Sequence, residues 1–233
     1  MSAPGFARAR SDAQRAERRE AILSVASSML VHVRVNDLSL NELARQVGLA
    51  KSNVLRYFES REAVLLELYA REFEAWLDAV EAALLVKAAL AESLQPGARV
   101  DAEVVARTIA EQAAARPVFC ELTASAAGVL EHNVSTEVAA TYKRATISSA
   151  RRLAEIVGGY LGEFTEATGI VFVSGVIVAI GGVWLISEPS PSMEAAYQAD
   201  PELRMLAMDF AFMVEEIVAT LLVGLEHRAP HDR

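Results

Sequence analysis

The chain has 233 residues, of which 53% are hydrophobic and 23% are charged. This composition excludes a wholly disordered chain and leaves enough apolar surface for one large domain or two small ones. Alanine is abundant, with 42 residues against 12 glycines and 7 prolines, so the composition predicts an all-α fold. The single cysteine, Cys120, has no disulfide or zinc-site companion, which suits a reducing cytosol.

Charge is divided unevenly along the chain, whose net charge is −9. The first 60 residues carry nine Lys or Arg and six Asp or Glu, whereas the rest carries 13 and 25. A basic head on an acidic body is typical of a protein in which only the head meets phosphate groups. Ordinary variation in surface charge is the alternative interpretation, because a net charge of +3 in the head is modest.

Apolar residues at three- and four-residue steps predict helices through almost the whole chain. The Pro- and Ser-rich segment 188–192 is expected to be a loop. No stretch shows sustained alternation of apolar and polar residues, so no sheet is expected. The expected helices cover residues 11–33, 39–46, 51–58, 60–92, 99–115, 117–131, 135–161, 165–187 and 200–226.

Residues 167–187 contain no charged side chain and are long enough to cross a membrane. Four glycines and acidic residues on both flanks make this segment a poor membrane helix. Its small residues Gly175, Ala179 and Gly182 share one face, which lets a second helix approach closely. A buried helix–helix seam is therefore the preferred interpretation, and a membrane span is the alternative.

The final expected helix carries a wide apolar stripe, more than a monomer needs. Together with the helix before it, this stripe predicts a subunit interface in which a symmetric pair forms a four-helix bundle. A monomeric core is the alternative. The residues expected in the interface are Gly175, Ala179, Gly182, Phe210, Met213, Ile217 and Leu221.

The segment most informative about function ends at Phe58. Ser39 can cap a first short helix, and Gly48 supplies the left-handed backbone of a tight turn. Val54 and Phe58 then face inward on a second helix. Two short helices joined in this way predict a helix-turn-helix, whose second helix enters the major groove of DNA. A surface helical hairpin with ordinary polar residues is the alternative.

The outer face of the second helix suits DNA. Lys51 and Arg56 are cationic, and Ser52 and Asn53 can hydrogen-bond to bases. Tyr57 offers a hydroxyl group to a phosphate oxygen.

Several short motifs occur together between residues 15 and 70. They are Ala-Ile-Leu-Ser-Val-Ala at 21–26, Glu42-Leu43-Ala44, Val47-Gly48-Leu49, Lys51, Arg56-Tyr57-Phe58 and Ser60-Arg61-Glu62-Ala63-Val64-Leu65. In this combination the segment resembles the amino-terminal domain of the tetracycline-repressor (TetR) family.

The resemblance implies an all-α fold with a three-helix DNA-binding head, a long linking helix, and an α-helical ligand-binding and dimerisation body. The expected domains are residues 1–62 and 63–233. The resemblance also implies a cytoplasmic, ligand-responsive regulator, a repressor, that binds near-palindromic double-stranded DNA as a homodimer. No enzymatic activity, cofactor, metal or membrane is expected.

Within this frame, phosphate contacts are expected to give affinity and base contacts to give discrimination. Leu55 stands where the family commonly has Tyr, and it can contact a thymine methyl group. Ala50 cannot cap the second helix, where the family often has Ser or Thr. We expect phosphate contacts from Ser39, Lys51, Tyr57 and Arg61, and contacts to base edges or nearby phosphates from Ser52, Asn53 and Arg56.

The basic residues before the first motif, Arg8, Arg10 and Arg15, can form an arm that reaches an adjacent groove. A frayed basic tail is the alternative interpretation.

An effector pocket is expected inside the body, and its composition favours an apolar or aromatic small molecule. Plain core packing is the alternative for each of its residues. These residues are Trp76, Phe119, Cys120, Leu122, Tyr142 and Trp184.

Rival functions are less well supported. The four histidines show no metal-ligand spacing, and the chain lacks the common nucleotide-binding, esterase and metalloprotease motifs, so an enzyme is not expected. The remaining alternative is a helical small-molecule-binding or membrane-associated protein that does not bind DNA.

Overall fold

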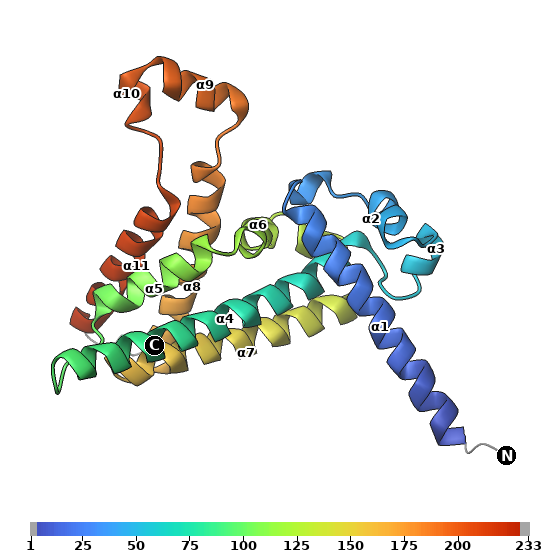
Figure 1. Ribbon diagram of the computed structural model, residues 1–233, viewed down its shortest axis with the longest axis horizontal. Helices are drawn as coiled ribbons and strands as arrows, with labels where there is room; N and C mark the ends of the chain where they lie inside the picture. Colours follow the sequence, from blue (N-terminus) through green and yellow to red (C-terminus); the bar gives the residue numbers. More distant parts are fainter. Residues whose placement is uncertain (1–3, 229–233) are drawn as a thin grey trace. The chain divides into compact units, whose positions relative to one another are not determined.

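The computed structural model describes residues 4–228, with side chains described from residue 13 onward. Within these residues the chain forms eleven α-helices and no strand, so the predicted all-α fold is confirmed (Figure 1). The helices divide between two compact units. The first unit contains the residues up to Arg71 together with Ser125–Lys143, and the second contains Glu72–Ala124 and the residues from Arg144 onward.

The first unit contains the three helices expected of a DNA-binding head. They are α1 (Pro4–Leu30), α2 (Leu40–Val47) and α3 (Lys51–Val54). The unit also contains the beginning of α4 (Arg61–Leu94) and of α7 (Thr136–Leu161), and both of these long helices continue into the second unit. The core of the head draws on all four of its first helices through the buried side chains of Ile22, Leu23, Leu43, Val54 and Leu65.

The turn between α2 and α3 follows from local chemistry. The hydroxyl group of Ser39 accepts a hydrogen bond from the backbone N–H of Glu42 at 3.1 Å and so caps α2. Gly48 has φ of 74°, and the N–H of the following Leu49 returns to the carbonyl of Ala44 at 2.9 Å. Such a left-handed helix end is cheap only for glycine. The predicted helix–Gly–helix arrangement is therefore confirmed.

The second helix of this pair is shorter than expected. The segment 51–58 was predicted as helix, but only Lys51–Val54 forms an α-helix. The chain then tightens, because the N–H groups of Tyr57 and Phe58 both donate to the carbonyl of Val54, at 2.9 and 3.1 Å. We call residues 51–58 the recognition segment.

The second unit is a helical bundle in which α11 lies against α5 and α8 (Figure 1). An ion pair between Arg107 on α5 and Glu215 on α11, at 2.9 Å, supports this contact. The helices that belong to this unit, besides the remainders of α4 and α7, are α5 (Ala102–Ala114), α6 (Pro117–Ser125), α8 (Glu166–Ser187), α9 (Pro191–Ala199), α10 (Pro201–Arg204) and α11 (Phe210–His227).

A single arginine joins α4 to α7 in this unit. The guanidinium group of Arg152 lies 3.0 Å from Glu74, 2.7 Å from Asp78 and 2.7 Å from Glu81. The hydrogen bonds that Arg152 donates to Glu81 and Asp78 raise its pKa above the ordinary value. The hydroxyl group of Ser149 also donates to Glu74, at 2.5 Å. A cluster of this kind costs less side-chain entropy per contact than separate pairs, because one guanidinium serves three carboxylates.

The second half of the chain differs from the expected helices in three places. Helix α6 ends at Ser125 rather than 131. The segment 188–199, expected to begin as a loop, contains α9, because Ser190 caps the N–H of Met193 and Pro191 occupies the first helical position. The helix expected over 200–226 is divided into α10 and α11, whose start is capped by Asp209.

Helix α8 forms a close seam within the chain, but the predicted face is only partly correct: Gly175 and Ala179 lie in the seam, whereas Gly182 is exposed and Gly181 is buried instead. A Cβ atom added at Gly175 would lie 2.5 Å from Leu221 on α11, and one added at Gly181 would lie 3.3 Å from the Cα of Ala124. By length and composition alone α8 could cross a membrane, and 44% of its most apolar window is buried inside the protein. Core helices of soluble proteins pass the same test, so this finding is weak support for a membrane span.

The seam predicts that Gly181 tolerates a methyl group poorly. Gly181→Ala places Cβ against the backbone of Ala124, whereas Gly159→Ala on α7 meets nothing within 4 Å. Both variants gain the same helix propensity, so their difference isolates the contact. In urea titrations we expect Gly181→Ala to be less stable than Gly159→Ala by about 1–3 kcal/mol. Equal stability of the two variants would show that α6 and α8 are not in close contact.

Burial predicts an inert thiol at Cys120. Its side chain is fully buried, its Sγ donates to the carbonyl of Ala113 at 3.2 Å, and burial raises its pKa to about 12. The thiolate is therefore scarce at pH 8. We expect Ellman's reagent to label the native protein at least about a hundredfold more slowly than the urea-unfolded protein. Rapid labelling of folded protein would place Cys120 at the surface.

Candidate nucleic-acid interface

The recognition segment presents its polar side chains to solvent. Lys51, Ser52, Asn53 and Arg56 are exposed, whereas Val54 on the inner face is fully buried. Leu55 is 42% exposed, so an apolar side chain lies among the polar ones. The side of α3 that would face a base-pair edge is therefore free of covering residues in the head, and its buried side fixes which way it points.

A residue that the sequence analysis did not single out holds this segment in place. The guanidinium group of Arg19 on α1 donates to the carbonyl of Tyr57 and forms an ion pair with Glu67 on α4. It also lies over the ring of Phe58, 4.2 Å from its centroid. No spacing rule reveals this role, because Arg18 beside it has the same charge. We call these contacts the Arg19 clamp.

Arg61, predicted to contact phosphate, is directed inward. Its guanidinium group donates to the carbonyls of Val35, Asn36 and Leu38 at 3.4, 3.4 and 3.1 Å. It also pairs with Glu62 at 2.8 Å. These contacts hold the turn before α2 against the start of α4, so Arg61 could serve a phosphate only by sharing donors already in use.

Helix α2 contributes a neutralised pair. The carboxylate of Glu42 accepts hydrogen bonds from Arg45 at 2.5 and 2.9 Å and from Gln46 at 3.0 Å. These contacts, those of Arg45 first, lower the pKa of Glu42 to about 2. Ser39, predicted to contact phosphate, is exposed, and its oxygen accepts the capping hydrogen bond. A hydroxyl group in that state can still donate to a phosphate.

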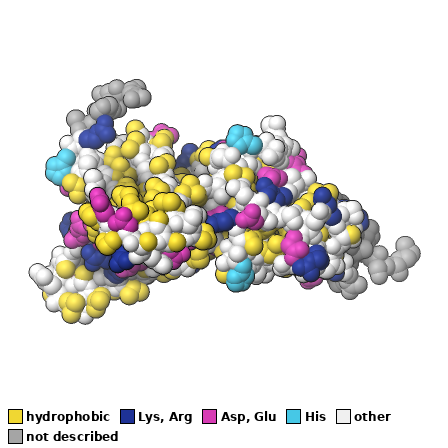
Figure 2. Space-filling model, turned by 90° about the horizontal axis from the view of Figure 1, so that it is seen from above, with side chains coloured by type: hydrophobic (Ala, Val, Ile, Leu, Met, Phe, Trp, Pro, Cys, Tyr) yellow, Lys and Arg dark blue, Asp and Glu magenta, His cyan; other side chains and the backbone are white. Residues whose placement is uncertain are grey.

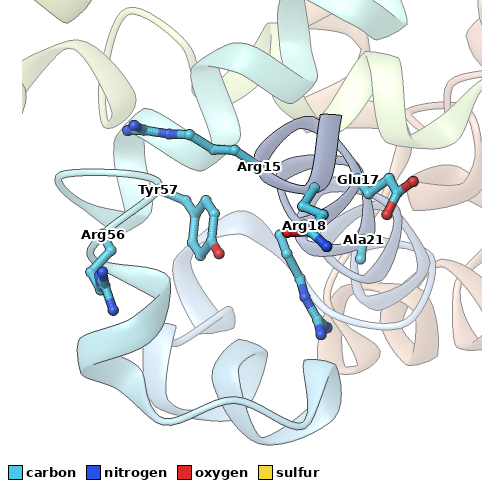
Figure 3. A pocket seen from close by; sticks show the side chains of 7 residues that line it. Arg15, Glu17, Arg18, Ala21, Arg56 and Tyr57 are labelled. Carbon is cyan, nitrogen blue, oxygen red and sulfur yellow. The ribbon is translucent and has the colours of Figure 1, made fainter. Parts of the chain in front are cut away.

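A hollow of about 670 Å³ lies between α1 and the end of the recognition segment. Its lining includes Arg15 and Arg18 from α1, and Arg56 and Tyr57 from the recognition segment (Figure 3). We call it the α1 hollow. Arg15 thus lies beside the candidate interface, whereas the side chains of Arg8 and Arg10, expected in the same arm, lie outside the described residues.

The residues expected in an effector pocket are only partly brought together. In the second unit the rings of Trp76 and Phe119 are stacked, with centroids 5.0 Å apart, and Cys120 and Leu122 are fully buried. Trp184 is half-buried, and its Nε1 donates to Glu121 at 3.0 Å. Tyr142 belongs to the first unit, where its ring lies 6.1 Å from that of Tyr69.

The residues expected in a subunit interface also divide into two groups. Gly175 and Leu221 meet each other inside the chain, and Ala179 is buried. Phe210 and Met213 are half-buried, and the ring of Trp184 packs edge-on against Phe210 at 5.5 Å. The exposed members of the set are Gly182 and Ile217.

A metal-binding cluster is not seen in the part of the chain that the structure describes, since no three His, Cys, Asp or Glu side chains there lie together suitably.

The chain is similar to known proteins over most of its length. The family described as "Tetracyclin repressor-like, C-terminal domain" matches residues 70–229, more than half of the chain. No curated protein matches it. A solved structure from Shewanella sp. PV-4, described as a TetR family transcription regulator, is similar at 17% identity and a TM-score of 0.51, covering 89% of this chain and 97% of that chain. A transcriptional regulator from Streptomyces coelicolor A3(2) has 16% identity and a TM-score of 0.47, covering 91% and 98%.

The Shewanella structure supports the fold, and the family match covers the part of the chain that follows the helix-turn-helix. The amino-terminal motifs had already indicated the same family from different residues. The chain belongs to the TetR family of transcriptional regulators.

Proposed function

We propose that this TetR-family regulator is a cytoplasmic repressor that binds a near-palindromic operator as a homodimer and leaves it when a small apolar effector binds. The observation that carries the proposal is the exposed row Lys51, Ser52, Asn53 and Arg56 above the buried Val54. Cationic donors would supply affinity through phosphates, and Asn53 and Arg56 would distinguish adenine and guanine edges. Selection of bound fragments from a random DNA pool tests the proposal and yields the symmetry of the site.

The surface of the second unit supports dimerisation. Large apolar side chains are exposed on its last long helices, among them Val178 and Leu185 on α8, at 73% and 63%, and Phe212 on α11, at 58%. Figure 2 shows hydrophobic side chains gathered on the surface that this unit forms. Exposed apolar area of this kind marks an interaction surface. In a two-fold dimer, two recognition segments about 34–36 Å apart would read two half-sites.

The aromatic core of the second unit supports an effector site. Phe73 packs edge-on against both Trp76 and Phe119, with centroids 5.6 and 5.5 Å away. Among the described side chains, the buried Nε1 of Trp76 is a donor without a hydrogen-bond partner. Because an unsatisfied buried donor is costly, an aromatic effector with an acceptor atom would gain a hydrogen bond there. Such an effector releases DNA only if it binds the DNA-incompetent state more tightly.

The two cationic residues of the recognition segment should act differently. Lys51→Ala should weaken binding to every duplex alike and reduce the slope of log K against log salt by about 0.9. Arg56→Ala should weaken binding to the selected operator by about 1–3 kcal/mol more than to random sequence. Fluorescence anisotropy titrations of both duplexes at several salt concentrations measure these effects.

Arg151→Ala is the matched control for both variants, because it removes an exposed positive charge from the second unit. Its affinity and salt slope should equal those of the wild type. If Lys51→Ala and Arg56→Ala also equal the wild type, the recognition segment does not contact DNA.

Charge placed on the exposed apolar face should dissociate the dimer. Ile217→Arg buries an unpaired guanidinium group in the proposed interface, whereas Ile147→Arg on α7 makes the same change elsewhere. We expect sedimentation velocity to show monomers for Ile217→Arg at concentrations at which the wild type and Ile147→Arg are dimers. A wild-type protein that sediments as a monomer would refute the proposed dimer.

A further inference from the structure

The described lining of the α1 hollow contains more positively than negatively charged side chains. Among the described residues of its lining, Arg15, Arg18 and Arg56 bring three guanidinium groups and Glu17 brings one carboxylate. In Figure 3, Arg18 and Tyr57 extend toward the space between α1 and the recognition segment, and the side chain of Glu17 extends from α1 in another direction. Throughout the described residues, none of these three arginines forms an ion pair.

Carboxylates are available close to these unpaired arginines, because neighbouring arginines do form ion pairs. Arg19, next to Arg18 in sequence, pairs with Glu67, and Arg71 pairs with both Glu20 and Glu67. Glu20 and Glu67 are therefore paired on the side of α1 that packs against α4. The face toward the recognition segment keeps Arg15 and Arg18 three residues apart on one side of the helix, where like charges repel unless an anion lies between them.

We propose that the α1 hollow holds a phosphate group of the DNA backbone, so that α1 belongs to the interface together with the recognition segment. The inference rests on the proposed DNA-binding function and deepens it. Arg18 and Arg15 would grip the phosphate oxygens through their planar donor forks, and the Tyr57 hydroxyl group would donate a further hydrogen bond. Arg56 lines the side of the hollow formed by the recognition segment. The DNA backbone that borders the major groove beside α3 would therefore pass next to the hollow.

The Arg19 clamp gives this hollow a fixed shape. Arg19 ties the carbonyl of Tyr57 to α1, so the wall formed by the recognition segment and the wall formed by α1 keep their separation. A phosphate held between them would fix the register of α3 in the groove without reading any base. Arg18 is therefore expected to add affinity that is independent of sequence.

The test uses the full-length protein, a 30-base-pair duplex of random sequence, and the duplex selected from the random pool. Arg18→Ala should weaken binding to both duplexes by the same factor, about tenfold near 0.1 M salt, and reduce the salt slope by about 0.9. Arg18→Lys should restore the slope, because it keeps the charge. Arg151→Ala again controls for net charge, and circular dichroism confirms that each variant is folded.

The outcomes separate this inference from the function on which it rests. If the wild type binds both duplexes and Arg18→Ala matches it in affinity and slope, α1 does not hold a phosphate and the inference fails alone. If the wild type binds neither duplex, the proposed function fails first. If 10 mM inorganic phosphate raises the melting temperature of the wild type but not of Arg18→Ala, while their DNA affinities agree, the hollow takes a free anion and the DNA assignment is overturned.

Discussion

One guanidinium group, together with the buried side chains of Val54 and Phe58, fixes the orientation of the recognition segment. Helix α3 has a single turn, too short to keep its direction through its own hydrogen bonds. Arg19 supplies the missing constraint, because it reaches the carbonyl of Tyr57, the carboxylate of Glu67 and the ring of Phe58 at once. Those three partners belong to the recognition segment and α4, while Arg19 itself belongs to α1. The exposed residues of α3 thus inherit their positions from a contact on its buried side.

The basic residues of the first unit fall into two groups, those bound to other groups of the unit and those exposed to solvent. Arg19, Arg45 and Arg61 donate hydrogen bonds to carboxylates and carbonyls of the same unit. Lys51 and Arg56 are exposed and form no ion pair with another described residue. The excess of acidic residues after residue 60 disfavours contact of that part with a polyanion, so binding would be confined to the small basic surface.

Sequence alone could predict those features that depend on residues close together in the chain. The turn at Gly48 and the inward direction of Val54 follow from backbone sterics and helical periodicity, and both were predictable. Apart from Glu62, the hydrogen-bond partners of Arg19 and Arg61 lie 23 to 48 residues away, and no local pattern distinguishes an inward arginine from an outward one. Helix α9 was missed for another reason, since its Pro and Ser residues, which serve as a cap and first turn, are equally common in loops.

Helix α4 has a mechanical property that follows from its composition. Its 34 residues contain neither glycine nor proline, so the rod, about 51 Å long, has no residue suited to act as a hinge. Bending it would break backbone hydrogen bonds, whereas pivoting it as a whole would not. A pivot of about 5° moves the far end of such a rod by about 4 Å, close to the rise of a single base-pair step. A lever of this kind would convert a slight shift among packed side chains at one end into a mismatch of register at the other.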